Sequence, residues 1–308
     1  MQKPPTAALV PPVKDLNPNN LVRRVVSGDS SMRRFWRTAS RMVTSNAASG
    51  ELAALTADVQ VPLTTGQRIA IASVRGGAGK SVVAALLASV YAARRRDRVM
   101  VADADPEGGS LLWRLGLLKH LPLSAIAPKL LSAVGNDLTG LEQLLPRTPS
   151  GLWVLPGGAP GQPQLPRDVT RALSRLFAVC VTDCSMGMSS PATAGVLSEA
   201  HTLVLVVPAT PDGVYATCGA LQRMAANQSP SLSRVVLVLN KLGPDADSGL
   251  RYNVALETLG RFGLPMVPLP YDRHVAAGTP IFPSRIGEET LVQITRLAGR
   301  ALAPTRPS

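Results

Sequence analysis

Aromatic residues and long apolar runs are scarce in this sequence. Phe, Trp and Tyr make up 4% of the 308 residues, whereas apolar residues make up 45%, so we expect a core built mostly from Ala, Val and Leu. No apolar run approaches the ~20 residues that span a bilayer, and the first residues lack the apolar region of a secretion signal. We therefore expect a cytoplasmic protein and leave peripheral contact with a membrane open.

Cysteines are also few. Cys180, Cys184 and Cys218 form neither an even set nor the paired spacing of a metal site, which excludes a disulfide-stapled secreted domain. We predict that they are small buried residues in a reducing compartment.

Positive charge, by contrast, is abundant. The net charge is +12, and residues 1–66 carry eight Lys and Arg against four Asp and Glu. Such an excess favours acidic partners, either nucleic acid or an anionic lipid surface. Because the excess is densest at the start of the chain, we expect that part to be a contact element.

The pattern along the chain predicts four parts. Residues 1–20 hold five prolines and three asparagines without periodicity, which is typical of a disordered leader. The remaining parts are a basic helical extension at 21–66, a main domain at 67–302 and a tail at 303–308.

Residues 32–43 predict a basic amphipathic helix within the extension. Apolar side chains recur there at helical spacing, and Arg33, Arg34, Arg37 and Arg41 lie largely off that face. Such a helix can pack on its own core, bind a membrane surface, or bind a protein partner through residues 21–60. Periodicity does not separate these alternatives.

The main domain alternates short apolar runs with helix-length stretches. This rhythm predicts an α/β fold, with a mainly parallel sheet covered by helices on both faces. We also expect residues 155–166 to form a surface loop, residues 94–98 a solvated helix end, and residues 288–301 a packed helix. The predicted strands are 69–74, 99–102, 152–155, 178–182, 203–207, 235–239 and 266–267.

A glycine-rich stretch between the first strand and the next helix predicts a phosphate loop. Glycines at 76, 77 and 79 permit positive φ and allow backbone N–H groups to surround an anion, while the following helix points its positive dipole end at it. Lys80 would reach the β and γ phosphates, and Ser81 would give its hydroxyl to Mg²⁺. The predicted nucleotide contacts here are Gly76, Gly77, Ala78, Gly79, Lys80, Ser81 and Val82.

Carboxylates follow two later strands. Asp103 and Asp105 leave their strand at alternate positions, so both can face one Mg²⁺–phosphate cluster. Asp183 ends a mostly apolar strand, the Walker-B arrangement, and Gly187 can offer its N–H to the γ phosphate. We predict Ser81, Asp103 and Asp183 as metal ligands, and Asp105 as the residue that orients the attacking water.

Two further strand ends predict a base pocket. Asn240 can pair with a purine edge, and the position where guanine-specific enzymes carry Asp is Gly243, so adenine is favoured. Backbone groups around Pro270 and Asp272 can line the same pocket. The expected cofactors are ATP and Mg²⁺.

These motifs resemble the ParA/MinD family of P-loop ATPases. That family has a deviant loop K-G-G-x-G-K-[ST], an Asp-x-Asp switch, an Asp-x-x-x-Gly switch, an adenine-binding Asn and a late Pro-x-Asp segment. Counterparts occur here in the same order, at residues 75–81, 103–105, 183–187, 240 and 270–272. The resemblance implies the P-loop NTPase fold and an ATP-sandwich homodimer whose slow hydrolysis resets the cycle.

One position departs from the family signature. Arg75 stands where the family has a lysine that crosses the dimer interface to the partner's phosphates. Arg is always cationic and forks onto phosphate, so the charge is kept while the geometry changes. The chain also resembles actinobacterial family members associated with type VII secretion, which share the Arg form and a basic N-terminus.

Three functions remain open on these grounds. The first is an ATPase switch that positions or regulates a cellular assembly, with Lys80, Asp105 and Arg75 as catalytic residues. The second is a low-turnover ATP-binding adaptor of a type VII secretion or membrane complex. The third is a DNA-partitioning ATPase whose basic surface holds nucleic acid.

Overall fold

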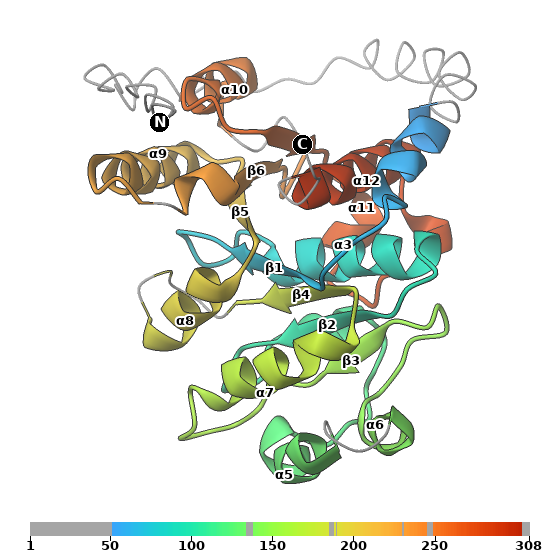
Figure 1. Cartoon of the computed structure of the whole chain (residues 1–308). Helices are drawn as coiled ribbons and strands as arrows, with labels where there is room; N and C mark the ends of the chain where they lie inside the picture. The colour runs from blue at the N-terminus through green and yellow to red at the C-terminus, as the bar shows by residue number, and fades with distance from the viewer. Residues whose placement is uncertain are drawn as a thin grey trace, which may run out of the picture.

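Seven parallel strands form one sheet at the centre of the molecule (Figure 1). A computed structural model describes residues 51–133, 138–184, 188, 190–229, 231–244 and 249–303. The predicted leader, the basic helix at residues 32–43 and residues 304–308 of the tail lie outside these described residues.

The sheet has the order β3-β2-β4-β1-β5-β6-β7, and every neighbouring pair runs parallel. All seven strands predicted from the sequence are confirmed. Six of them are buried along nearly their whole length, as in a parallel sheet covered on both faces, whereas β7 alternates between half-buried and buried residues. Their bounds are β1 (Gln67–Ala72), β2 (Val99–Asp103), β3 (Trp153–Leu155), β4 (Val179–Asp183), β5 (Thr202–Pro208), β6 (Val235–Asn240) and β7 (Met266–Leu269).

Helices cover both faces of the sheet, as predicted. One face packs against α3 (Lys80–Arg94), α4 (Leu111–Arg114) and α12 (Glu288–Leu302), and α11 (Arg273–Ala276) lies at its margin. The other face is covered by α5 (Leu123–Ala133), α6 (Leu138–Leu144), α7 (Leu165–Leu173), α8 (Pro191–Glu199), α9 (Pro211–Ala226) and α10 (Tyr252–Gly260). Short 3₁₀ turns occur at Ser174–Leu176, Leu232–Arg234 and Pro283–Arg285.

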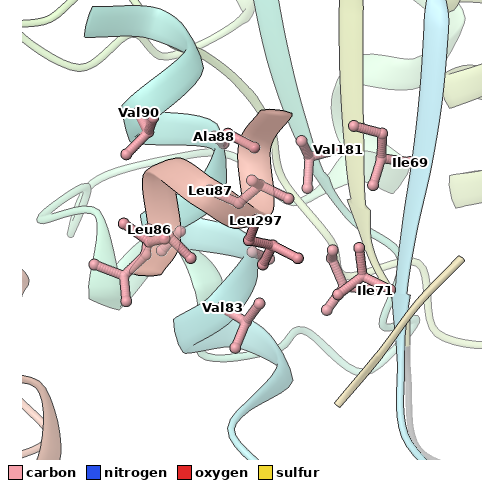
Figure 2. Packing of buried hydrophobic residues seen from close by; sticks show 14 of the residues in the cluster. Ile69, Ile71, Val83, Leu86, Leu87, Ala88, Val90, Val181 and Leu297 are labelled. Atoms are coloured by element: carbon pink, nitrogen blue, oxygen red, sulfur yellow. The ribbon is translucent and has the colours of Figure 1, made fainter. Parts of the chain in front are cut away.

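Helix α3 is buried between the sheet and α12. Ile69 and Ile71 of β1 alternate onto one face and meet Val83 and Leu87 of α3, with Leu297 of α12 beside them (Figure 2). The hydroxyl of Tyr91 in α3 donates to the Ala298 carbonyl of α12 at 2.8 Å. The element that follows the phosphate loop is therefore held from both sides. The predicted packing of the last helix is confirmed.

The helical segment at residues 51–59 packs against α12, and Arg95 ties the following chain to the core. Arg95 is buried and donates to the carbonyls of Val59 and Val61 at 2.5 and 3.0 Å, while also pairing with Asp97. The prediction of a fully solvated helix end at residues 94–98 is wrong at this position. From the sequence alone, a charged residue after a helix is expected to lie in solvent. Here the Arg95 guanidinium instead donates to backbone carbonyls that would otherwise lack a hydrogen-bond partner.

The three cysteines are buried and free, as the sequence analysis predicted. Burial raises the pKa of the Cys184 thiol, and the neighbouring Asp183 charge raises it further. These thiols are packing residues of the sheet and α9.

Candidate functional site

Three polar side chains lie on the same face of the sheet, where their strands end. Asp103, Asp183 and Asn240 continue the alternation of apolar residues that pack against α3, so each side chain projects toward the start of that helix. Asp103 and Asp183 are also register partners on neighbouring strands. The sheet thereby gathers residues that are far apart in sequence at its carboxyl edge.

The loop between β1 and α3 has the backbone shape of an anion cradle. Gly77 has φ 72° and Gly79 has φ 89°, and Gly79 is the N-cap of α3 without a side-chain cap. The first N–H groups of this 15-residue helix consequently face outward, with Lys80 and Ser81 at its first two positions. Of the three glycines that permit positive φ, Gly77 and Gly79 adopt it and Gly76 does not.

Asn240 holds this loop from the side of β6. Its amide Nδ2 donates to the Ala78 carbonyl at 2.9 Å, and the side chain is buried. The fit is close, because a Cβ on Gly79 would lie 2.4 Å from the same nitrogen. Asn240, predicted as an adenine contact, is thus also a support of the phosphate loop.

Ser73 is a site residue that the sequence analysis missed. It follows β1, and its hydroxyl donates to the Arg75 carbonyl at 2.6 Å and accepts from Lys80 Nζ at 3.4 Å. The serine therefore joins the two ends of the loop and orients the lysine. A polar residue directly after a buried strand was the available signal.

Asp183 is a buried carboxylate with an unsatisfied oxygen. It is 4% exposed, and its Oδ1 has no hydrogen-bond partner. Burial raises the pKa of Asp183 to about 7, the Ser81 hydroxyl and Lys80 lower it, and Asp103 and Asp105 raise it further. An orphaned oxygen beside a serine hydroxyl and a lysine suits a hard cation, so these residues fit the predicted Mg²⁺.

Asp103 has a different environment. Its Oδ1 accepts from the Asp105 N–H at 3.0 Å and its Oδ2 from the Gly109 N–H at 2.9 Å. Burial raises the pKa of Asp103 to about 6, and those two backbone hydrogen bonds lower it. Asp103 fixes the loop that carries Asp105, while its direct ligation of a metal remains a prediction.

The segment after β3 lies beneath that loop. The N–H groups of Gly158 and Ala159 donate to the carbonyls of Asp105 and Pro106 at 3.2 and 2.7 Å. A Cβ on Gly157 would lie 2.7 Å from the Asp105 carbonyl oxygen. The prediction of a surface loop at residues 155–166 is therefore wrong for residues 155–157, 159 and 166, which are buried, and residues 165 and 166 already belong to α7. Gly157 and Gly158, expected to lie in a surface loop, instead allow the segment after β3 to lie close to the backbone of Asp105.

Arg75 projects away from the loop into solvent. Its Nε lies 3.8 Å from Asp212 Oδ2 at the start of α9, and the two side chains are 55% and 69% exposed. An ion pair this exposed contributes about 0–1 kcal/mol, so Arg75 is available for other anions.

The segment after β7 follows the strand next to Asn240, and its Asp272 has a structural role as the cap of a helix. Asp272 caps α11, accepting from the N–H groups of His274 and Val275 at 2.9 and 3.2 Å and from Gly287 at 2.8 Å. Pro270 and Asp272 also line a cavity of about 960 Å³. Gly187, predicted to contact the γ phosphate, lies outside the described residues.

A family model describes most of this chain. The model of the CobQ/CobB/MinD/ParA nucleotide-binding domain matches residues 69–279. The match begins inside β1 and includes the phosphate loop, both aspartate-bearing strand ends and Asn240.

Two curated proteins are similar in sequence. The ESX-1 secretion-associated protein EspI of Mycobacterium tuberculosis is 33% identical over 230 residues, covering 70% of this chain and 33% of that protein. This chain thus spans about a third of the length of EspI. An uncharacterized ATP-binding protein of Methanocaldococcus jannaschii is 26% identical over 241 residues, covering 73% of this chain and 85% of that protein.

Solved structures share the fold. A ParA family ATPase from Chlorobium tepidum has a TM-score of 0.62 at 16% identity, covering 76% of this chain and 98% of that one. MinD of Pyrococcus horikoshii, solved with Mg-ADP, has a TM-score of 0.55 at 18% identity, covering 75% of this chain and 94% of that one. Within the described ranges, no helix has the length and apolarity needed to cross a membrane.

Proposed function

This chain belongs to the CobQ/CobB/MinD/ParA family of nucleotide-binding domains, and from that premise we propose that it is a slow ATPase that works as a nucleotide-dependent dimerisation switch. The observation that supports this most directly is the junction of the phosphate loop with Asp183. Here the N-terminus of α3, Lys80 and a buried carboxylate with an unsatisfied oxygen meet at the carboxyl edge of the sheet.

Each residue of the junction has a task in this proposal. Backbone N–H groups of residues 76–82 hold the phosphates, and Lys80, oriented by Ser73, neutralises their charge. Mg²⁺ supplies further neutralisation when it is bound with the nucleotide, and Ser81 and Asp183 would hold it. Asp105 orients the attacking water.

The base is proposed to lie on the other side of the loop, toward β6 and β7. Asn240 is already fixed there by Ala78, and Gly243 leaves the guanine-selecting position without a carboxylate. This arrangement favours adenine. Competition of ATP and GTP for the nucleotide-free protein, followed by calorimetry, measures that preference.

Arg75 is proposed to act across the dimer. Its exposure and its weak tie to Asp212 leave the guanidinium free to reach a second copy's phosphates. Molar mass by light scattering with ATP, ADP or no nucleotide tests the switch: we expect a dimer with ATP alone, lost in Arg75→Ala. Arg223→Ala, an exposed arginine on α9, removes the same charge and should leave the dimer intact. An ATP-independent monomer in the parent would refute the switch.

Hydrolysis is tested separately from binding. Lys80→Ala should abolish detectable ATP binding, while Asp105→Ala should keep binding and slow turnover by about 10²-fold, the cost of misplacing a reacting group by about 1 Å. Lys119→Ala, an exposed lysine, is the matched control. Parent-like turnover in both site variants would contradict these roles.

A second candidate is favoured by the similarity to EspI. That protein is named as secretion-associated, and this chain would then be an ATP-holding adaptor that docks on a type VII secretion or membrane complex through residues 21–60. In that case, removal of residues 1–60 should abolish partner capture and leave ATP affinity unchanged. Equal loss of both would count against an adaptor.

A further inference from the structure

Helix α4 is hydrogen-bonded to the chain that follows β7. The indole N–H of Trp113 donates to the Gly278 carbonyl at 2.7 Å, and Arg114 Nη1 donates to the Val275 carbonyl at 3.0 Å. In the opposite direction, the N–H of Ile281 donates to the Arg114 carbonyl at 2.8 Å. The two side-chain bonds span 165 and 161 positions of the sequence, so they hold together stretches of chain that no strand pairing joins.

The start of α4 is fixed to the loop that carries Asp105. Asp103 accepts from the N–H groups of Asp105 and Gly109 at 3.0 and 2.9 Å. Helix α4 begins two residues later at Leu111, whose side chain is fully buried in the core that also contains α3. The Asp105 loop, residues 104–110, is therefore anchored by Asp103 at one end and by α4 at the other.

The chain after β7 is also continuous with the side where the base is proposed to lie. Pro270 and Asp272 belong to that side, and we call residues 270–281 the base-side segment. Asp272 caps α11 by accepting from the N–H of Val275 at 3.2 Å. The carbonyl of the same valine accepts from Arg114. A single turn of helix thus separates the base side from α4.

We propose that Trp113 and Arg114 are positioning residues that make the base-side segment and the Asp105 loop one unit, so that adenine binding helps to place the attacking water. This inference rests on the proposed function and deepens it. A base that contacts residues 270–272 favours the position in which α4 holds the base-side segment, and that position also fixes the Asp105 loop. Because such coupling is reciprocal, loosening α4 reduces what the base contributes to affinity.

Calorimetry in the presence of Mg²⁺ tests this by comparing ATP with inorganic tripolyphosphate, which has the phosphates but no base. In the parent, ATP should bind more tightly. Arg114→Met removes the donor to Val275 and should weaken ATP binding about fivefold or more, the low end for coupled sites, while tripolyphosphate binding stays unchanged. Trp113→Phe removes the other side-chain donor and should act in the same direction. Arg114→Lys keeps an N–H donor and should largely restore ATP binding.

Turnover gives a second measurement. With saturating ATP, Arg114→Met should slow hydrolysis by up to about 10²-fold, the cost of misplacing a reacting group by about 1 Å. Arg96→Met is the matched control, because Arg96 is exposed and precedes β2, at the opposite edge of the sheet from the site. This variant should leave both affinities and the turnover unchanged.

The outcomes separate this inference from the proposed function. In Arg114→Met, equal weakening of ATP and tripolyphosphate, or no weakening of either, would overturn the coupling, and unchanged turnover would overturn the placement of the water. A parent that binds the two ligands equally would also overturn it and leave the phosphate loop in its role. A parent that binds neither ligand would refute the nucleotide site itself, and this inference with it.

Discussion

At the scale of single residues, the buried carboxylate of Asp183 is the costliest group of the site. A charge buried without a full set of partners destabilises the folded chain until it is protonated or paired. Burial raises the pKa of Asp183 to about 7 from its usual 3.8. The folded state thus binds a proton that the unfolded state has released, and stability falls as pH rises from about 4 to about 7.

Asp183→Asn should remove this pH-dependent loss of folding stability, because Asn carries no charge. At pH 8 and without nucleotide, we expect the variant to exceed the parent in free energy of unfolding by about 2–4 kcal/mol, since one pKa unit corresponds to about 1.4 kcal/mol. At pH 4 the two should be equal. Urea unfolding at both values measures the difference. Parent and variant with identical stability at pH 8 would show that the carboxylate is solvated or paired.

Gly79 and Gly77 provide a matched test of the contact between Asn240 and the loop. Both have positive φ, so either alanine substitution costs about 1–2 kcal/mol in backbone strain. Only at Gly79 does a new Cβ meet Asn240, at 2.4 Å, whereas at Gly77 there is nothing within 4 Å. Gly79→Ala should therefore lose about 1–3 kcal/mol more than Gly77→Ala. Thermal unfolding compares them, and equal losses would mean that Asn240 does not press on the loop.

Local sequence patterns predicted the loop and the strand-end aspartates because each is set by a few adjacent residues. The contacts that support them were not predictable, since they join distant positions. Asn240 meets Ala78 across 162 residues, and Gly157, in the segment after β3, lies against Asp105. Arg95 likewise reads as solvated unless residues 59–61 are known to lie beside it.

At the scale of elements, the described helix at residues 51–59 is part of the domain's packing. Asp58 lies so close to α12 that a Cβ on Gly299 would be 2.9 Å from its Cβ. Glu51 pairs with Arg296 one turn earlier on α12. Two helices approach at a glycine because no side chain separates their backbones. The cavity next to α12 is consequently walled by a helix that precedes the first strand.

Gly299→Ala tests this approach against Gly219→Ala. In an open helix interior, replacing Gly by Ala stabilises by about 1 kcal/mol. A Cβ at Gly219 meets only the end of the Arg223 side chain, at 3.5 Å, so that gain is expected in α9. At Gly299 the clash should cancel or reverse it. Urea unfolding of both variants decides, and a full gain at Gly299 would show that helix 51–59 is not held there.

The strands were predictable one by one, but their order was not. A buried strand such as Val235–Asn240 can be recognised in the sequence from its run of apolar residues. The pairing of β1 with β4 and β5, by contrast, depends on contacts between residues more than 100 positions apart. The βαβ rhythm gives parallel strands without saying which are neighbours. Only that order brings Asp103 and Asp183 side by side on β2 and β4.

At the scale of the whole molecule, the charge of +12 predicts salt-dependent retention on nucleic acid. Each Lys or Arg that contacts a phosphate adds about −0.9 to the slope of log affinity against log salt. Replacing Arg33, Arg34, Arg37 and Arg41 by Gln should make the slope shallower by about 3–4 if all four contact DNA. Filter binding over a salt series measures it. Salt-insensitive retention of the parent would exclude phosphate-driven binding, and an unchanged slope would assign the contact to other residues.

The two limits of the described fold lie along the same helix. Glu51 pairs with Arg296, and residue 303 is about 10 Å further along the α12 axis. A short Gly-Ser linker can therefore join residue 303 to residue 51, while a new start is opened in the exposed turn between α9 and β6. We expect this circular permutant to fold with the circular-dichroism spectrum of the original order, because no sheet pairing or helix contact has to break.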